Sequence, residues 1–194
     1  MRSERLRPVS ESEKSFKSSV LFLGAHCALA LAAVLVAPAD GNSVPRFLRS
    51  WGEMLEVVVP SIQHIPVLTQ FSAQAWFASV VMWTLLPLSA VIAARLRGLW
   101  IPNETRLRRQ PWLLLFAAAI FGFVAVGMMR YSPVDTSGYG FGARNLAAMT
   151  GGRISYGIYL GLIVCGVGLS IGFLARLLPI ARRVMHDDFK DMRA

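Results

Sequence analysis

The sequence has 194 residues, of which 55% are hydrophobic and 16% are charged, and its mean hydropathy is +0.51. So few polar residues cannot cover a small soluble domain that encloses this much apolar volume, which excludes an ordinary water-soluble fold. The net charge of +9 gathers at the ends of apolar runs and not in a basic domain, so we expect no nucleic-acid partner.

Four segments are apolar over the length that a helix needs to cross a bilayer, about 20 residues. We predict transmembrane helices at 20–37, 75–94, 112–129 and 154–178. The other segments are a cytoplasmic tail at 1–19, an external segment at 38–74, a basic cytoplasmic loop at 95–111, an external Gly- and Tyr-rich loop at 130–153 and a basic tail at 179–194. The predicted fold class is therefore an all-α integral membrane protein.

The basic residues predict on which side of the membrane each segment lies. Fifteen of the 20 Lys and Arg residues belong to 1–19, to 95–111 or to the part of the chain beyond 175, and five belong to the two other segments. Because positively charged segments stay in the cytoplasm, we expect both termini on that side. This pattern is typical of a multi-pass protein of the bacterial inner membrane.

The first predicted span also fits a cleavable signal peptide, since a basic stretch precedes it and the A-P-A sequence at 37–39 follows it, although the long N-terminal stretch favours retention. His26 lies at mid-span, where an ionisable residue is a functional candidate. A haem between helices needs two axial ligands, and the other histidines, His64 and His186, lie in a loop and a tail. We therefore expect no cofactor and no metal, and a neutral His26 that is hydrogen-bonded to a neighbouring helix.

The external segment contains a predicted amphipathic helix at 47–59. Apolar residues recur there at helical spacing, and Glu53 and Glu56 lie on the polar side with Arg49, which can pair with Glu53. Trp51 suits the headgroup level of a bilayer. We expect this helix either to lie on the external surface of the membrane or to pack onto the bundle.

Pro87 lies inside the second predicted span. It removes one backbone hydrogen bond, so it should kink the helix there. Such kinks are common in membrane bundles, because neighbouring helices and side chains satisfy the freed backbone groups. We interpret this proline as structural and not as a hinge.

Small residues recur on one face of the fourth predicted span, at intervals of four, four, three and four: Gly157, Gly161, Cys165, Gly168 and Gly172. Shorter stripes lie on the third and first spans: Ala118, Gly122 and Ala125, and Gly24, Ala28 and Ala32. Since lipid gives helices little hydrophobic reason to associate, close backbone contact through such faces becomes a main source of packing energy. These faces are expected either to pack the bundle or to bind another membrane subunit.

No catalytic, nucleotide-binding or metal-binding motif is found. We predict a non-catalytic inner-membrane subunit or assembly factor of a bacterial secretion, conjugation or respiratory complex, whose partners are lipid and other membrane subunits or further copies of itself. One alternative is a small oligomeric transporter or channel lined by the few intramembrane polar residues: His26, Ser79, Thr84, Ser89 and Ser170. A second alternative is an enzyme that modifies lipid or an envelope polymer with Glu53, Glu56 and His64.

Overall fold

The computed structural model describes residues 7–64, 66–96, 110, 112–129 and 151–191. Within these ranges the chain forms helices and no strand, which confirms the predicted all-α class. The elements are α1 (Arg7–Val36), η1 (Gly41–Ser43), α2 (Arg46–Val58), α3 (Ser61–His64), η2 (Pro66–Leu68), α4 (Ser72–Thr84), α5 (Leu86–Arg95), α7 (Trp112–Met129) and α9 (Arg153–Asp191). Most of the basic loop at 95–111 and of the Gly- and Tyr-rich loop at 130–153 lies outside the described residues.

Three helices in the described ranges are long and apolar enough to cross a membrane. Their apolar stretches are Phe16–Val36 in α1, Trp112–Met129 in α7 and Arg153–Arg183 in α9, with mean hydropathies of 2.3, 2.3 and 2.2. Helices α4 and α5 reach the required length only together, as a pair bent by 45°. The described chain therefore holds three candidate spans, or four if the bent pair is one span.

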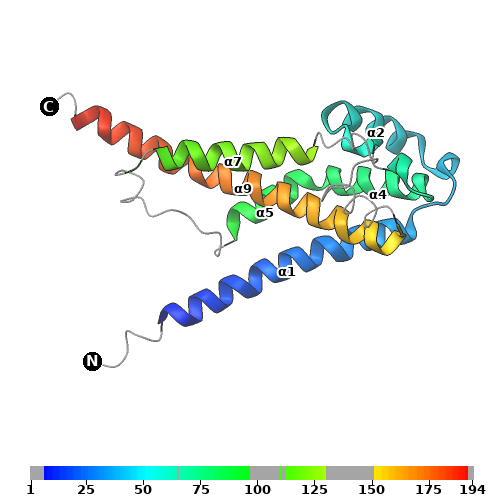
Figure 1. The fold of residues 1–194 in the computed structure, drawn as a ribbon, viewed down its shortest axis with the longest axis horizontal. Coiled ribbons are helices and arrows are strands. Elements are labelled where there is room, and N and C mark those ends of the chain that lie inside the picture. Colours follow the sequence, from blue (N-terminus) through cyan, green and yellow to red (C-terminus); the bar gives the residue numbers. More distant parts are fainter. Residues whose placement is uncertain (1–6, 65, 97–109, 111, 130–150, 192–194) are drawn as a thin grey trace, which may run out of the picture.

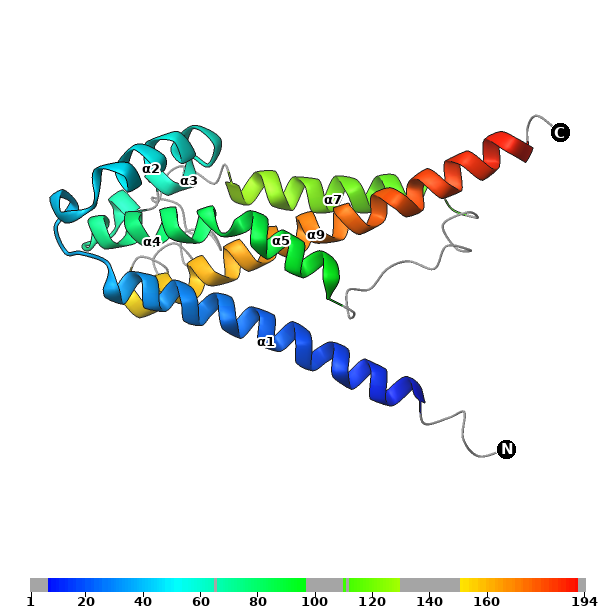
Figure 2. The same ribbon diagram turned by 180° about the vertical axis from the view of Figure 1, so that it is seen from behind.

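Helix α9 forms the centre of the bundle. It runs along the length of the molecule, and α1, α5 and α7 each pack against it (Figure 1). Helix α1 packs on the first part of α9 and diverges from it toward its own N-terminus, whereas α7 lies beside the later part (Figures 1 and 2). The first turn of α1 and the last turn of α9 therefore lie at one end of the molecule, and α2 and α3 lie at the other.

The second predicted span is bent by 45° beside Pro87, as expected, and the bend divides it into two helices. Helix α4 ends at Thr84 and α5 begins at Leu86, so the bend falls at the residue between them. Pro87 stands in the first turn of α5, where a helix tolerates the missing N–H. The hydroxyl of Thr84 donates to the carbonyl of Val80 at 2.7 Å, a contact that also bends helices. The proline and the threonine together account for the break.

Two helices extend beyond their apolar stretches. Helix α9 continues through Pro179 to Asp191, where the sequence suggested a basic tail after the span. Leu177 is buried against Leu114 of α7, and residues after the proline pack on the same cluster. Contact with α7 therefore supports the helix across the proline. Helix α1 likewise begins before its apolar stretch, at Arg7.

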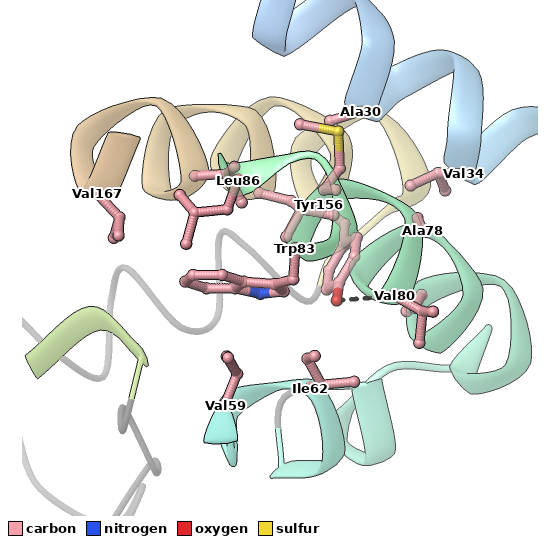
Figure 3. Packing of buried hydrophobic residues seen from close by; sticks show 14 of the residues in the cluster. Ala30, Val34, Val59, Ile62, Ala78, Val80, Trp83, Leu86, Tyr156 and Val167 are labelled. Atoms are coloured by element: carbon pink, nitrogen blue, oxygen red, sulfur yellow. Dashed lines mark hydrogen bonds between the residues drawn. The ribbon is translucent and has the colours of Figure 1, made fainter. Parts of the chain in front are cut away.

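The main hydrophobic core lies at the α2–α3 end of the molecule (Figure 3). Tyr156 of α9, Met82 of α4 and Ile62 of α3 are fully buried there. A second, smaller cluster joins α7 to α9, where the ring centroids of Phe121 and Phe173 lie 4.2 Å apart. The bundle is thus broad and well packed at one end, and α7 is attached through a narrower contact.

Candidate functional site

Two of the predicted interface glycines, Gly157 and Gly161, lie against α1. A methyl group added at Gly161 would lie 2.6 Å from the Cα of Cys27, and one added at Gly157 would lie 2.8 Å from the Cα of Leu31. Backbone atoms cannot turn away as a flexible side chain can. These two glycines therefore allow α1 and α9 to touch backbone to backbone, as small-residue faces do in membrane proteins.

Gly168 and Gly172 lie against α5 instead. A methyl group added at Gly172 would lie 2.8 Å from the amide nitrogen of Ala94, and one added at Gly168 would overlap the hydroxyl of Ser89. Cys165, between the two pairs of glycines, is 1% exposed. The face that could have bound another subunit is therefore occupied by α1 and α5 of the same chain.

The shorter stripes of small residues have different surroundings. On α7, Ala125 is buried, whereas Ala118 is exposed and a methyl group added at Gly122 would meet no atom within 4 Å. The stripe on α1 is exposed at all three of its positions, Gly24, Ala28 and Ala32. The same spacing therefore marks a packed face on α9 and largely open surfaces on α7 and α1.

His26 forms hydrogen bonds through both of its ring nitrogens. Nδ1 lies 2.8 Å from the carbonyl oxygen of Phe22, and Nε2 lies 2.8 Å from the Oγ of Ser89 on α5. A carbonyl oxygen can only accept, so Nδ1 donates to Phe22, and the Ser89 hydroxyl is the partner of Nε2. The structure thus supplies the neighbouring-helix partner that the sequence leads us to expect for a neutral His26.

Other polar side chains inside the candidate spans are bonded as well. The hydroxyl groups of Ser79 and Tyr156 lie 2.7 Å apart, which joins α4 to α9. Ser170 donates to the carbonyl of Gly166 in its own helix. Arg176 of α9 donates at 2.7 Å to the carbonyl oxygen of residue 96, just past the last turn of α5. These bonds satisfy polar groups that would otherwise be costly in an apolar medium. They also link α9 to α4 and to the end of α5.

Helix α2 packs on α4 through Gly52. A methyl group added there would overlap the ring of Trp76 and would lie 2.9 Å from a methyl carbon of Val80. Two bonds hold the same contact: the indole N–H of Trp51 donates to Thr84 at 2.7 Å, and that of Trp76 donates to Glu56 at 2.6 Å. One side of α2 is therefore fixed to the bundle.

A neighbouring side of α2 is apolar and exposed, and Trp51 lies at the boundary between it and the side that packs on α4. It presents four residues at intervals of four, three and four, with exposed fractions of 72%, 41%, 64% and 66%: Phe47, Trp51, Met54 and Val58. The two arrangements expected for this helix, packing onto the bundle and lying on a membrane surface, therefore belong to two different faces of it. Both remain compatible with the structure at once.

A cavity of about 490 Å³ lies beside the polar side of α2. Its lining includes Glu53, Glu56, Arg49 and Trp76, but not His64. The guanidinium of Arg49 donates to the carbonyl of Gly41 at 2.9 Å, and it forms no ion pair with Glu53 in the described part of the chain. The structure thus brings the two glutamates to one cavity and leaves the histidine outside it.

No family model, no curated protein and no solved structure matches this chain. Its geometry alone therefore indicates what the chain can do. Among the described residues, no three His, Cys, Asp or Glu side chains are grouped so that they could hold a metal ion. The described residues provide close helix contacts, interhelical hydrogen bonds and the cavity beside α2 that Glu53 and Glu56 line.

Sequence reasoning missed two residues of the contact between α2 and α4, Gly52 and Trp76. A single glycine forms no periodic stripe, so the spacing of small residues did not reveal Gly52. A glycine inside an otherwise favourable helical sequence is nevertheless a sign that another element approaches closely. A tryptophan near the end of a predicted span, as Trp76 is, suggests the aromatic belt of a membrane protein. Instead, its indole ring covers Gly52 and its N–H binds Glu56.

Proposed function

We propose that this chain crosses the bacterial inner membrane four times, with both ends in the cytoplasm. Helices α1, α7 and α9 and the bent pair α4–α5 have the length and apolarity for the four crossings. The start of α1 and the end of α9 share one end of the molecule, as an even number of crossings requires (Figure 1). Fifteen of the 20 Lys and Arg residues belong to segments that this topology leaves inside.

Within that membrane we propose a role as a non-catalytic subunit or assembly factor of a larger envelope complex. The observation that carries this proposal is the surface of α7. Its apolar stretch is 11% buried, against 50% for that of α9, and large side chains such as Leu115, Phe116 and Phe123 are exposed. A helix attached along one side can receive a helix of another subunit without any change in the bundle.

The polar interior of the bundle supports a scaffold better than a transporter. Conduction needs polar groups that face an open path. Here His26 is bonded to Ser89, Ser79 is bonded to Tyr156, and Ser170 is bonded to its own helix. These polar side chains are therefore already engaged in hydrogen bonds, between helices for His26 and Ser79 and within one helix for Ser170.

A photoreactive phenylalanine analogue on α7 tests the subunit role. It replaces Phe123, which is 79% exposed, and a matched control replaces Leu23, an exposed residue of α1. In native membranes we expect irradiation to add a protein of one defined mass at Phe123 and none at Leu23. Lipid adducts alone at both positions would contradict the subunit role and would leave the proposed topology intact.

A second candidate function is modification of a lipid or an envelope polymer on the external side. The observation in its favour is that Glu53 and Glu56 line one cavity, since two carboxyl groups can divide the roles of general acid and base. Glu56→Gln keeps an acceptor for the indole of Trp76, so it tests chemistry with little change in structure. If both Glu53→Gln and Glu56→Gln support a wild-type cellular phenotype at normal protein levels, the enzyme role is wrong.

A further inference from the structure

An apolar groove separates α1 from α5. Both helices pack on α9 (Figure 2). The groove encloses about 490 Å³, and its walls include Leu21 and Leu29 of α1 and Leu88 and Ile92 of α5. All four side chains are also exposed at the molecular surface, so the groove opens sideways out of the bundle.

The polar groups of this groove are placed at defined points along it. His26 and Ser89 belong to its lining, and the hydrogen bond between them satisfies both side chains. An apolar chain can therefore pass them without leaving a donor unpaired. Ser18 lines the end at which α1 begins, and basic residues flank that end: Lys17 precedes Ser18, and the exposed Arg95 belongs to the last turn of α5.

We propose that the α1–α5 groove holds one acyl chain of an anionic phospholipid from the cytoplasmic leaflet, with the lipid phosphate beside Arg95. The proposal rests on the membrane topology given above and is independent of the subunit role. Aliphatic walls match the chain, and basic residues at the membrane surface attract anionic headgroups. The charge at the end of the groove is thus complementary to the headgroup of such a lipid.

The charge at one end of the groove favours a lipid chain over an apolar helix of a partner. The walls are aliphatic along the groove, and Arg95 lies in the last turn of α5, next to the lining residue at position 96. An anionic phospholipid has the same arrangement, a charge at the end of an apolar chain, whereas an apolar helix carries no anionic group that Arg95 would attract.

Native mass spectrometry of the full-length chain tests the proposal. The protein is reconstituted with equal amounts of phosphatidylglycerol and phosphatidylcholine, transferred to detergent, and weighed with the lipid that it retains. We expect one retained phosphatidylglycerol, preferred over phosphatidylcholine by about fivefold, the effect of one basic residue near an anionic headgroup. We expect Arg95→Gln to remove that preference while a lipid is still retained.

Groove-filling variants identify where the lipid lies. Ala25→Phe places a ring in the groove, whereas Ala28→Phe changes an exposed alanine of the same helix outside its lining. Leu88→Trp and its control Val91→Trp repeat the comparison on α5, in case one alanine variant fails to fold. We expect each groove variant to retain about one-fifth or less of the lipid that the wild-type protein retains, because the new ring occupies the space of the acyl chain. Each control should retain the wild-type amount.

Two results would overturn the proposal. One is equal lipid retention by the groove variants and their controls, and the other is a wild-type protein that retains both lipids equally. If the inserted protein gives either result, the lipid site is wrong and the four-span topology stands. If the chain does not insert into bilayers at all, the proposed membrane topology is wrong, and the lipid site that rests on it is wrong as well.

Discussion

Helices α9 and α7 are almost equally apolar, with mean hydropathies of 2.2 and 2.3, yet half of the α9 stretch is buried and only 11% of the α7 stretch is. Both helices also carry stripes of small residues. On α9, all four glycines of the stripe lie against atoms of α1 or α5. On α7, Gly122 meets nothing within 4 Å.

This difference shows that the hydropathy of a helix indicates whether it can lie in lipid, and not which other helix it packs against. Close approach needs small residues on one helix and accessible backbone on the other. Helix α1 offers such backbone at Cys27 and Leu31, where Gly157 and Gly161 lie. The contact between α7 and α9 relies on large side chains instead, such as the stacked rings of Phe121 and Phe173. Substitutions of single glycines test whether α9 and α7 differ in this way.

The largest effect is expected for Gly161→Leu. The added side chain would begin 2.6 Å from the Cα of Cys27 and 2.8 Å from the carbonyl oxygen of His26, neither of which can move unless α1 moves. Overpacking without room to adjust destabilises a fold by about 3 kcal/mol or more. Unfolding by sodium dodecyl sulfate in mixed micelles measures the loss of stability.

The matched control is Gly122→Leu on α7, where the new side chain enters open space. Leucine is also the better helix former, by roughly 1 kcal/mol. We therefore expect the free energy of unfolding of the isolated chain to be unchanged or slightly increased. Equal destabilisation by the two variants would show that the glycines of α9 have no special part in packing.

A smaller effect is expected for Gly52→Val in α2. The new side chain meets the ring of Trp76, which can shift, so we expect a loss of about 1–3 kcal/mol that is confined to the contact of α2 with α4. Hydrogen exchange should rise in Arg46–Val58 and stay the same in α9. Gly24→Ala, at an exposed position with open space around it, serves as the control. Faster exchange throughout the bundle would show that α2 is part of the core and not a separate attachment.

The fold class could be predicted because it depends on the lengths of apolar runs, and α7 indeed covers 112–129. Helix ends could not be predicted in the same way. Charged residues continue α1 and α9 beyond their apolar stretches, because a helix once begun adds residues at little cost. The bend after Thr84 was expected from Pro87 alone, but Thr84 also bonds to Val80 and receives the indole of Trp51. Such tertiary contacts leave no periodic pattern in a sequence.

The spacing of small residues indicated which face of α9 packs, but it could not indicate the partner helix. The division between α1 and α5 depends on how those helices cross α9. Grouping His64 with Glu53 and Glu56 rested on closeness in sequence, and the structure places His64 outside the cavity that the glutamates line. The pairing of Arg49 with Glu53 failed for a similar reason, since the carbonyl of Gly41 from the preceding turn competes for the guanidinium.

The smallest effect is expected for the polar link between α1 and α5. His26→Phe, Ser89→Ala and the double variant form a cycle whose coupling energy isolates the 2.8 Å bond between the two side chains. Hydrogen bonds between membrane helices average about 0.6 kcal/mol in such cycles and reach about 1.7 kcal/mol. In the control cycle, Ser170→Ala replaces Ser89→Ala. Ser170 bonds within its own helix, so the free-energy changes of Ser170→Ala and His26→Phe should add. A coupling near zero for His26 and Ser89 would mean that the glycine contacts alone hold α1 in place, and that His26 is retained for some purpose other than packing.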